Sequence, residues 1–232
     1  MTETPNQSHL KPQVDLSLYD NSWYSPQRGF ICRMLWHLVN VVVLQNPLNV
    51  SSRLKVWALR VFGARVGRAV VLKPGINVKY PWHLDIGDHV WIGEKVWLDS
   101  LVNIRIGSHV CISQGAYLCT GNHDWTDPGF GLLVRPIEIE NGAWIGAGAT
   151  VLPGVVVASH AVLASGGVLS QNAQAYMIYA GNPATAIKSR VIQSQINARF
   201  ADPDECLNAA TEILDLNGSS LEPLPLRVPA QR

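Results

Sequence analysis

Charged residues are scarce in this sequence, and no long run of like charge stands out among them. Asp, Glu, Lys and Arg make up 15% of the 232 residues, and the formal net charge is +1. This balance leaves no electrostatic footprint for nucleic acid and no run of Lys and Arg long enough for a polybasic membrane signal. We therefore expect no nucleic-acid partner.

Closely spaced cysteines, a secretory signal and a membrane span are also missing. The four cysteines form no C-x-x-C pair, which favours reduced thiols in a cytosol over a disulfide framework. Residues 1–24 are polar where a signal peptide would be apolar, so we expect a cytoplasmic protein. The longest apolar run, residues 31–44, is too short to span a bilayer and contains Arg33, His37 and Asn40.

The apolar content, 47% of the chain, is enough for a substantial core in one domain. We predict a weakly ordered segment over residues 1–25 and a helical cap over residues 26–63. The second helix of the cap has Ser51 as its N-cap and ends at Gly63. The first has an apolar face made of Phe30, Met34, Leu38 and Val41.

Both helices are expected to pack on the end or side of the scaffold that follows them. The alternative is a peripheral membrane contact through Trp36, Val42, Val43 and Trp57.

A six-residue repeat governs the middle of the chain. Its first position is aliphatic and its fifth is small or β-branched, and these two inward positions fit neither long alternating strands nor a helix. The first positions are Val66, Leu72, Ile86, Ile92, Leu98, Ile104, Ile106, Ile112, Leu118, Ile139, Ile145, Val151, Val157, Leu163 and Leu169. The fourth position is usually Gly, His or Asn, which tolerate positive φ most readily. Each unit is therefore a short strand followed by a tight corner.

Three such strands make one turn of a parallel β-solenoid, and residues 64–180 provide about five coils. Val66 and Ile106 lie forty residues apart, which is two coils of twenty. From Ile106 to Ile139 there are thirty-three residues, so thirteen are added at one corner. We expect them to form a loop within residues 119–136 that is extruded from the scaffold.

The end of the chain is less regular. Residues 181–216 are predicted to form a C-terminal segment with a short helix, and residues 217–232, rich in proline, to form a disordered tail.

Four motifs carry a resemblance to a known family. They are D-N-S-W-Y-S-P at 20–26, C-I-S-Q-G-A-Y-L-C-T-G-N-H-D-W at 111–125, R-P-I-E-I at 135–139 and G-N-P-A at 181–184. With the repeat, they resemble the left-handed β-helix, hexapeptide-repeat acyltransferases, and among these the colanic-acid-biosynthesis and nodulation-type O-acetyltransferases. The resemblance implies a left-handed coil and a homotrimer with active sites between neighbouring subunits. It also implies acetyl-coenzyme A as donor and a saccharide hydroxyl as acceptor, on an exopolysaccharide or a lipid-linked sugar precursor.

Acyl transfer to a hydroxyl needs a base, because a sugar hydroxyl is a poor nucleophile at neutral pH. An imidazole, whose ordinary pKa is about 6.5, can accept the proton during attack on the thioester. In the family the base is a histidine on the extruded loop, and the matching residue is His123. Its neighbour Asp124 either orients the ring or caps a turn.

The resemblance places coenzyme A in a groove between adjacent solenoids. The matching donor-binding residues are Trp144, Ala147, Ser165, Gly166, Ser170, Gln171, Lys188 and Arg190. Gln171 stands where relatives often have a basic residue, so Lys188 and Arg190 are the expected phosphate partners. Packing at the subunit interface is an alternative role for Trp144.

The acceptor side is predicted from polar and aromatic residues near the loop. They are Asp99, Ser100 and Asn103, one coil before it, and Asn122 and Trp125 within it. His83 has no assigned position in the repeat and is a further candidate. Trp91 and Trp97 occupy equivalent sixth positions, which favours structural stacking on the outer face.

Other chemistries fit the sequence less well than direct attack does. A zinc site like that of γ-class carbonic anhydrases needs three histidines, and His109 and His123 lack the companions, so no metal is expected. A covalent route through Cys111 or Cys119 is less favoured than direct transfer. The remaining alternatives are an acyltransferase acting on an amine and a trimeric scaffold without activity.

Overall fold

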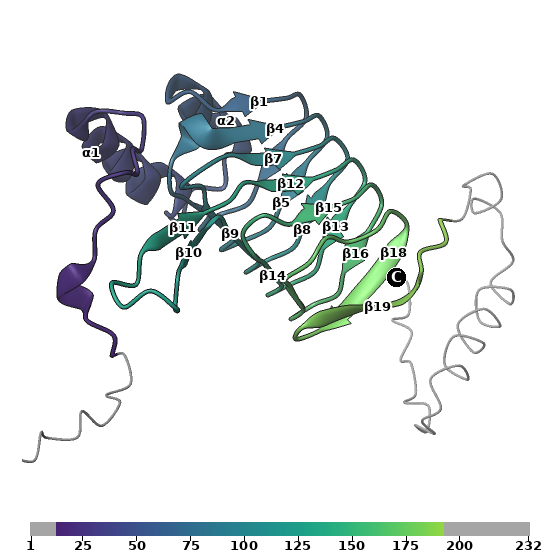
Figure 1. Cartoon of the computed structure of the whole chain (residues 1–232). Helices are drawn as coiled ribbons and strands as arrows, with labels where there is room; N and C mark the ends of the chain where they lie inside the picture. The colour runs from purple at the N-terminus through teal and green to yellow at the C-terminus, as the bar shows by residue number, and fades with distance from the viewer. Residues whose placement is uncertain (1–12, 193–232) are drawn as a thin grey trace, which may run out of the picture. The chain divides into compact units, whose positions relative to one another are not determined.

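The computed structural model describes residues 13–192, and most of these build a parallel β-solenoid (Figure 1). Residues 1–12, the predicted C-terminal helix and the tail at 217–232 lie outside the described residues. The solenoid has three faces, which we call A, B and C in chain order, and the corners between them are named A–B, B–C and C–A.

Stacked strands of successive coils form each face. Face A contains β1 (Arg65–Val66), β4 (Leu84–Ile86), β7 (Ile104–Ile106), β12 (Ile137–Ile139) and β15 (Val156–Val157). Face B contains β2 (Val71–Leu72), β5 (Trp91–Ile92), β8 (Cys111–Ile112), β13 (Trp144–Ile145), β16 (Val162–Leu163), β18 (Met177–Gly181) and β19 (Ala184–Ser189). Face C contains β3 (Asn77–Val78), β6 (Trp97–Asp99), β9 (Tyr117–Cys119), β14 (Thr150–Val151) and β17 (Val168–Leu169). Five coils are complete, and β18 begins a sixth.

The repeat phase predicted from the sequence is confirmed by the core. First-position residues such as Ile92, Ile112 and Ile145 are fully buried, and so are fifth-position residues such as Ala116 and Ala149. Apolar side chains of successive coils therefore stack along the solenoid axis, and their burial supplies the main favourable free energy of the fold.

The corners follow the predicted conformation with some exceptions. His89 and His109 have φ values of 57° and 60°, and their rings stack 5.1 Å apart. Gly121 and Asn172 lack the expected positive φ, because Gly121 lies in a strand pair and Asn172 lies where the last coil turns toward β18. Lys95 adopts a positive φ although it is not Gly, His or Asn. Hydrogen bonding between stacked corners therefore outweighs side-chain preference at that position.

The outer surfaces of the faces differ in character. Face A carries charged rungs such as Arg105–Glu138, whose atoms lie 2.9 Å apart. Face C carries Trp97, which stacks on Tyr117 at 4.7 Å, and face B carries Trp91. The predicted outward position of Trp91 and Trp97 is confirmed, but they lie on different faces and do not stack on each other.

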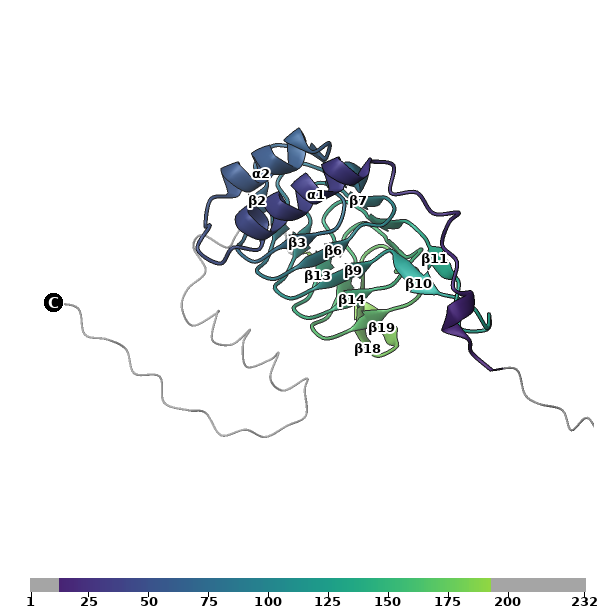
Figure 2. The same cartoon turned by 90° about the vertical axis from the view of Figure 1, so that its left-hand side faces the viewer.

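The helices α1 (Phe30–Val39) and α2 (Ser52–Val61), with the π-helical turn η2 (Asn40–Leu44) between them, lie side by side at the N-terminal end of the solenoid (Figure 2). Ser51 caps α2 as predicted, since its hydroxyl accepts a hydrogen bond from Leu54 N at 3.3 Å.

The prediction of which side of α1 packs against the solenoid is wrong. Trp36 is 2% exposed and donates its indole N–H to Val78 O at 3.0 Å, whereas Leu38 is 60% exposed. The other three residues of the predicted apolar face, Phe30, Met34 and Val41, are exposed as well. Because α1 is apolar on both sides, periodicity alone did not decide which side contacts the solenoid.

The N-terminal segment is ordered from residue 13, contrary to the predicted weak order over residues 1–25. It contains the short turn η1 (Leu16–Leu18) and runs from the extruded loop to α1 (Figure 1). Asp15 N donates to Pro128 O at 2.9 Å, and Tyr24 Oη donates to Leu101 O at 2.7 Å. We call residues 13–29 the N-terminal strap.

The boundary predicted at residue 180 is also wrong. β18 and β19 form an antiparallel hairpin on face B, with Gly181 paired to Ala184 at its turn. The G-N-P-A motif therefore closes a hairpin that continues the solenoid.

Candidate active site

The extruded loop is a small β-hairpin at the C–A corner of the third coil. Its strands are β10 (Gly121–His123) and β11 (Leu132–Val134), which pair antiparallel with His123 opposite Leu132. The loop carries an apolar run at residues 130–134, and its Leu132 is buried within its own chain. Leu133, 43% exposed, is the part of it that remains available to a neighbouring subunit.

His123 is held at the end of β10 by ring stacking and one hydrogen bond. Its Nδ1 lies 2.9 Å from Phe130 O, and its ring stacks on that of Phe130 with centroids 4.6 Å apart. A backbone carbonyl only accepts hydrogen bonds, so Nδ1 carries the proton of the neutral ring. Nε2 then presents an unprotonated lone pair, which is the state that a general base requires.

The carbonyl that orients His123 depends on a tight turn that the sequence prediction missed. The carboxylate of Asp127 accepts hydrogen bonds from Gly129 N at 3.1 Å and Gly131 N at 3.0 Å. Phe130, between these glycines, has a φ of 55°, a conformation that non-glycine residues adopt at a cost. The D-P-G-F-G run at 127–131 is the sequence signal that predicts such an Asp-capped turn.

Asp124 does not contact the ring of His123. Its Oδ1 accepts hydrogen bonds from Thr126 N at 2.9 Å and Thr126 Oγ1 at 2.6 Å, and these bonds lower the pKa of its carboxyl. Of the two predicted roles, the structure shows the turn cap. The orienting role belongs to Phe130 O.

Replacing Asp127 with Ala is expected to lower kcat about 10-fold, because the predicted base, His123, is then displaced by a fraction of an ångström from its geometry. The KM for the acyl donor should stay unchanged, since Asp127 acts through Phe130 and His123. Steady-state kinetics would measure both. The matched control is Thr126→Ala in the same turn, and an equal loss in that variant would contradict the positioning role.

A polar cluster lies at the same corner, formed by Tyr117 and Cys119 of the third coil and Asp99 of the coil before it. Tyr117 Oη lies 3.2 Å from Asp99 Oδ2, and burial raises the pKa of the Asp99 carboxyl. Cys119 pairs in register with Asp99, and its thiol donates to Gly121 O at 2.9 Å. The predicted acceptor residue Asp99 is therefore placed beside the stem of the hairpin.

Ser100 cannot contact a sugar, and its predicted role is wrong. Its side chain is fully buried and bridges the backbone of Tyr80, accepting from N at 3.0 Å and donating to O at 2.9 Å. Asn103 is exposed, but its Oδ1 lies 3.2 Å from Nδ1 of His83. His83 is buried between aromatic rings, and this burial lowers its pKa.

Ser100→Ala should lower the free energy of unfolding by about 1–3 kcal/mol, because it leaves two backbone groups of Tyr80 unpaired. Urea denaturation would measure the loss. The KM for the acceptor should not change, and an exposed serine, Ser170, provides the control for stability. If Ser100→Ala raised the KM for the acceptor and left the stability unchanged, the predicted contact between Ser100 and the sugar would be supported after all.

A pocket of about 260 Å³ joins residues predicted for the acceptor and the donor. It is lined by Asn122, Leu133, Arg135, Leu152, Pro153 and Ser170. Asn122 is the neighbour of His123, and Ser170 lies at the C–A corner two coils further on. Arg135, the first residue of the R-P-I-E-I motif, was not predicted to bind and brings a cation to Ser170 and the adjacent Gln171.

The other predicted donor residues lie on different sides of the solenoid. Trp144 is on face B and donates Nε1–H to Ser113 Oγ at 2.9 Å. Ala147, Ser165 and Gly166 lie at the B–C corner, where Gly166 N donates to Ala147 O at 2.8 Å.

Lys188 and Arg190, which are both predicted to bind the phosphates of the donor, differ in their surroundings. Arg190 donates to Gly142 O at 2.9 Å and His160 O at 3.0 Å, which ties it to the A–B corner. Lys188 lies in β19, paired with Ile178. A single chain therefore does not bring all the predicted donor residues to His123.

Comparison with known proteins identifies relatives of this chain. No protein-family model matches it. The putative colanic acid biosynthesis acetyltransferase WcaF of Escherichia coli K12 is 35% identical over 179 residues, which cover 75% of this chain and 98% of WcaF. The chain belongs to the hexapeptide-repeat acetyltransferases. It is accordingly an acyltransferase by family.

Solved structures show the same fold for this enzyme. The hexapeptide-repeat acetyltransferase VCA0836 of Vibrio cholerae, complexed with acetyl coenzyme A, matches with a TM-score of 0.63 at 20% identity, covering 70% of this chain and 88% of the other. A galactoside acetyltransferase in complex with coenzyme A matches with a TM-score of 0.60 at 20% identity, covering 74% and 86%. The predicted left-handed β-helix is thereby confirmed.

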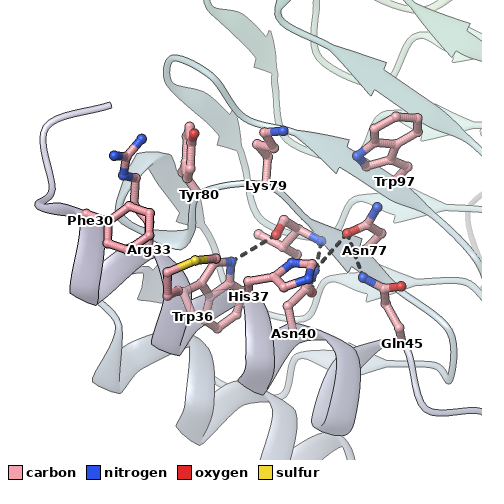
Figure 3. A pocket seen from close by; sticks show the side chains of 12 residues that line it. Phe30, Arg33, Trp36, His37, Asn40, Gln45, Asn77, Lys79, Tyr80 and Trp97 are labelled. Atoms are coloured by element: carbon pink, nitrogen blue, oxygen red, sulfur yellow. Dashed lines mark hydrogen bonds between the residues drawn. The ribbon is translucent and has the colours of Figure 1, made fainter. Parts of the chain in front are cut away.

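A second pocket of the enzyme, of about 400 Å³, lies between α1 and face C (Figure 3). Arg33 and His37 reach it from α1, and Lys79, Tyr80 and Trp97 reach it from the solenoid. Within residues 13–192, no three His, Cys, Asp or Glu side chains are grouped so that they would hold a metal ion.

Proposed function

We propose that the enzyme transfers an acetyl group from acetyl-coenzyme A to a hydroxyl of a saccharide, with His123 as general base. The observation that carries this proposal is the hydrogen bond from Nδ1 of His123 to Phe130 O, which leaves Nε2 free to accept a proton. The names of WcaF and of the galactoside acetyltransferase support a saccharide acceptor.

The chemistry follows from the orientation of His123. Nε2 accepts the proton of the acceptor hydroxyl as its oxygen attacks the thioester carbon, and the developing imidazolium is stabilised through Nδ1–H and Phe130 O. The new carbon–oxygen bond replaces the carbon–sulfur bond. His123 then returns the proton to the leaving sulfur, so no proton is left over.

The donor is proposed to lie across two neighbouring subunits of a homotrimer. Asn122, Ser170 and Arg135 lie on the same corner as His123, whereas Ala147 and Ser165 lie on the B–C corner. A groove between two solenoids places the B–C corner of one chain opposite the C–A corner of the next. Arg135 then adds a positive charge for the phosphates that Gln171 does not provide.

The acceptor is proposed to lie between the hairpin and the polar cluster at the stem. Asp99 supplies a hydrogen-bond acceptor or donor there, and Asn122 supplies a carboxamide. Trp125 is 78% exposed at the hairpin tip, which leaves its ring available to stack on a sugar.

The test is coenzyme A release by a thiol assay with acetyl-coenzyme A and a panel of neutral and amino saccharides. We expect release with neutral saccharides and, after removal of unreacted acetyl-coenzyme A, a product that alkaline hydroxylamine cleaves, as it does oxygen esters. A hydroxylamine-stable product formed only with amino saccharides would indicate acylation of an amine. No release with any acceptor would favour a scaffold without activity.

A further inference from the structure

The outward side of the two N-terminal helices is apolar and uncovered in the described part of the chain. Of the twenty-six large apolar side chains that are exposed there, twelve lie between Phe30 and Val61. They are Phe30, Ile31, Met34, Leu35, Leu38, Val41, Val42, Leu48, Val50, Leu54, Trp57 and Val61. We call this surface the helical platform. A contiguous apolar surface of this kind marks an interaction site.

The geometry of α1 shows that the platform is a continuous stripe. Successive residues of an α-helix are rotated by about 100°, so the five exposed apolar residues of α1, from Phe30 to Leu38, fall on one arc of about 140°. Trp36 and Asn40, which contact the solenoid, lie on the opposite side of the helix. The wider apolar stripe of α1 therefore points away from the protein.

The second helix repeats this arrangement with basic residues beside the apolar ones. Leu54, Trp57 and Val61 form an exposed row on α2, and Arg53 and Arg60 lie next to it on the same helix surface. An apolar row flanked by arginines is the pattern of a helix that lies in a membrane interface.

Basic and acidic residues are distributed unevenly along the chain, although the net charge is only +1. Between Asp20 and Asp85 there are nine Lys and Arg residues and no Asp or Glu. The rest of the chain has the other nine of the 18 basic residues and all 17 acidic ones, which gives +9 for this segment and −8 elsewhere. Both helices thus lie in the basic stretch of the sequence, and Arg28, Arg33, Arg53, Lys55 and Arg60 of this stretch lie in or beside them.

The arginines in or beside the two helices form no ion pair in the described residues, although Arg60 donates to Val66 O at 2.7 Å and to Gly67 O at 2.9 Å. Ion pairs within residues 13–192 involve Arg65, Arg68 and Arg105, all on the solenoid. Arg28, Arg33, Arg53 and Arg60 form none there. An anionic surface is the partner that complements both these charges and the apolar stripe.

We propose that the helical platform docks on an anionic lipid bilayer. No helix of residues 13–192 is long and apolar enough to cross a membrane, so the helices would lie in the interface, with Trp57 and Leu38 inserted and the arginines at the headgroups. A second copy of the chain bound platform to platform would bring like charges together, which makes it the less favourable occupant.

Docking would also fix the active site relative to the bilayer. The N-terminal strap begins at the β10–β11 hairpin, where the ring centroids of Tyr19 and His123 lie 5.8 Å apart, and it leads directly into α1. Trp82 Nε1 donates to Pro26 O at 2.8 Å and holds the strap to the solenoid. The docking surface and the hairpin are therefore connected by one ordered segment.

The test is cosedimentation of the full chain with vesicles of phosphatidylglycerol and phosphatidylethanolamine, compared with vesicles of phosphatidylcholine alone. We expect binding to the anionic vesicles that weakens as salt rises, because headgroup attraction is screened. Vesicle binding is measured without acetyl transfer, so a failure to bind would contradict membrane docking and leave the proposed function untouched.

Two variants and a control locate the contact. Leu38→Glu combined with Trp57→Glu should reduce binding about 10-fold or more, and Arg53→Ala about 5-fold. Ile187→Glu, on β19 and exposed to a similar degree as Trp57, should bind as the unchanged protein does.

Three results would overturn the proposal. They are no binding to anionic vesicles, equal binding to both vesicle types, and binding that the platform variants leave unchanged. Light scattering provides a further check, since dissociation of the oligomer by Leu38→Glu would identify a second copy of the chain as the occupant.

Discussion

Replacing His123 with Ala should lower kcat about 10²- to 10⁴-fold, because direct transfer to a hydroxyl loses its general base. The affinity for the acyl donor should change little, since no predicted donor contact involves this ring. Stopped-flow or steady-state coenzyme A release would measure kcat, and equilibrium binding of coenzyme A would measure affinity. Turnover at the level of the unchanged enzyme would contradict the proposed mechanism.

The matched control for this variant is Asp124→Ala. In a catalytic triad, loss of the carboxylate that orients the histidine costs about 10⁴ in kcat. Here the carboxylate of Asp124 caps a turn and the carbonyl of Phe130 orients the ring. We therefore expect Asp124→Ala to keep kcat within about 3-fold, because it removes only a turn cap. A loss as large as that of His123→Ala would show that Asp124 acts on the ring.

The scaffold was predictable from the sequence because a solenoid repeats one local rule. Each six-residue unit buries the same two positions, so the phase of Ile92 is confirmed independently by Ile112 and Ile145. The extruded hairpin was predictable for the same reason, since thirteen extra residues between Ile106 and Ile139 have no place in a coil.

Features that depend on single contacts were not predictable. The polarity of Ser100 predicts a sugar ligand, but its hydroxyl points inward and bridges the backbone N and O of Tyr80. The position of Asp124 beside His123 predicts a contact with the ring, but its partner is Thr126. For α1, two apolar sides competed, and the hydrogen bond of Trp36 to the solenoid decided between them.

The division of the donor residues leads to a prediction about the assembly. Ala147 lies on a different corner from His123, and one chain does not bring the two together. If the active site is formed between subunits, a chain with a defective histidine and a chain with a blocked groove should complement each other. His123→Ala and Ala147→Trp are the two variants, each expected to retain about 1% of activity or less when alone.

Coexpression with two different tags and purification through both would isolate mixed oligomers. In a cyclic trimer of either mixed composition, one interface pairs an intact His123 with an intact Ala147 from the neighbouring chain. Activity should therefore return to about one third of that of the unchanged enzyme. A site built within a single chain predicts no return, since every chain then carries a defect in its own site. Ala147→Ser, which adds little volume to the groove, should stay active alone and so shows that the bulk of Trp causes the block.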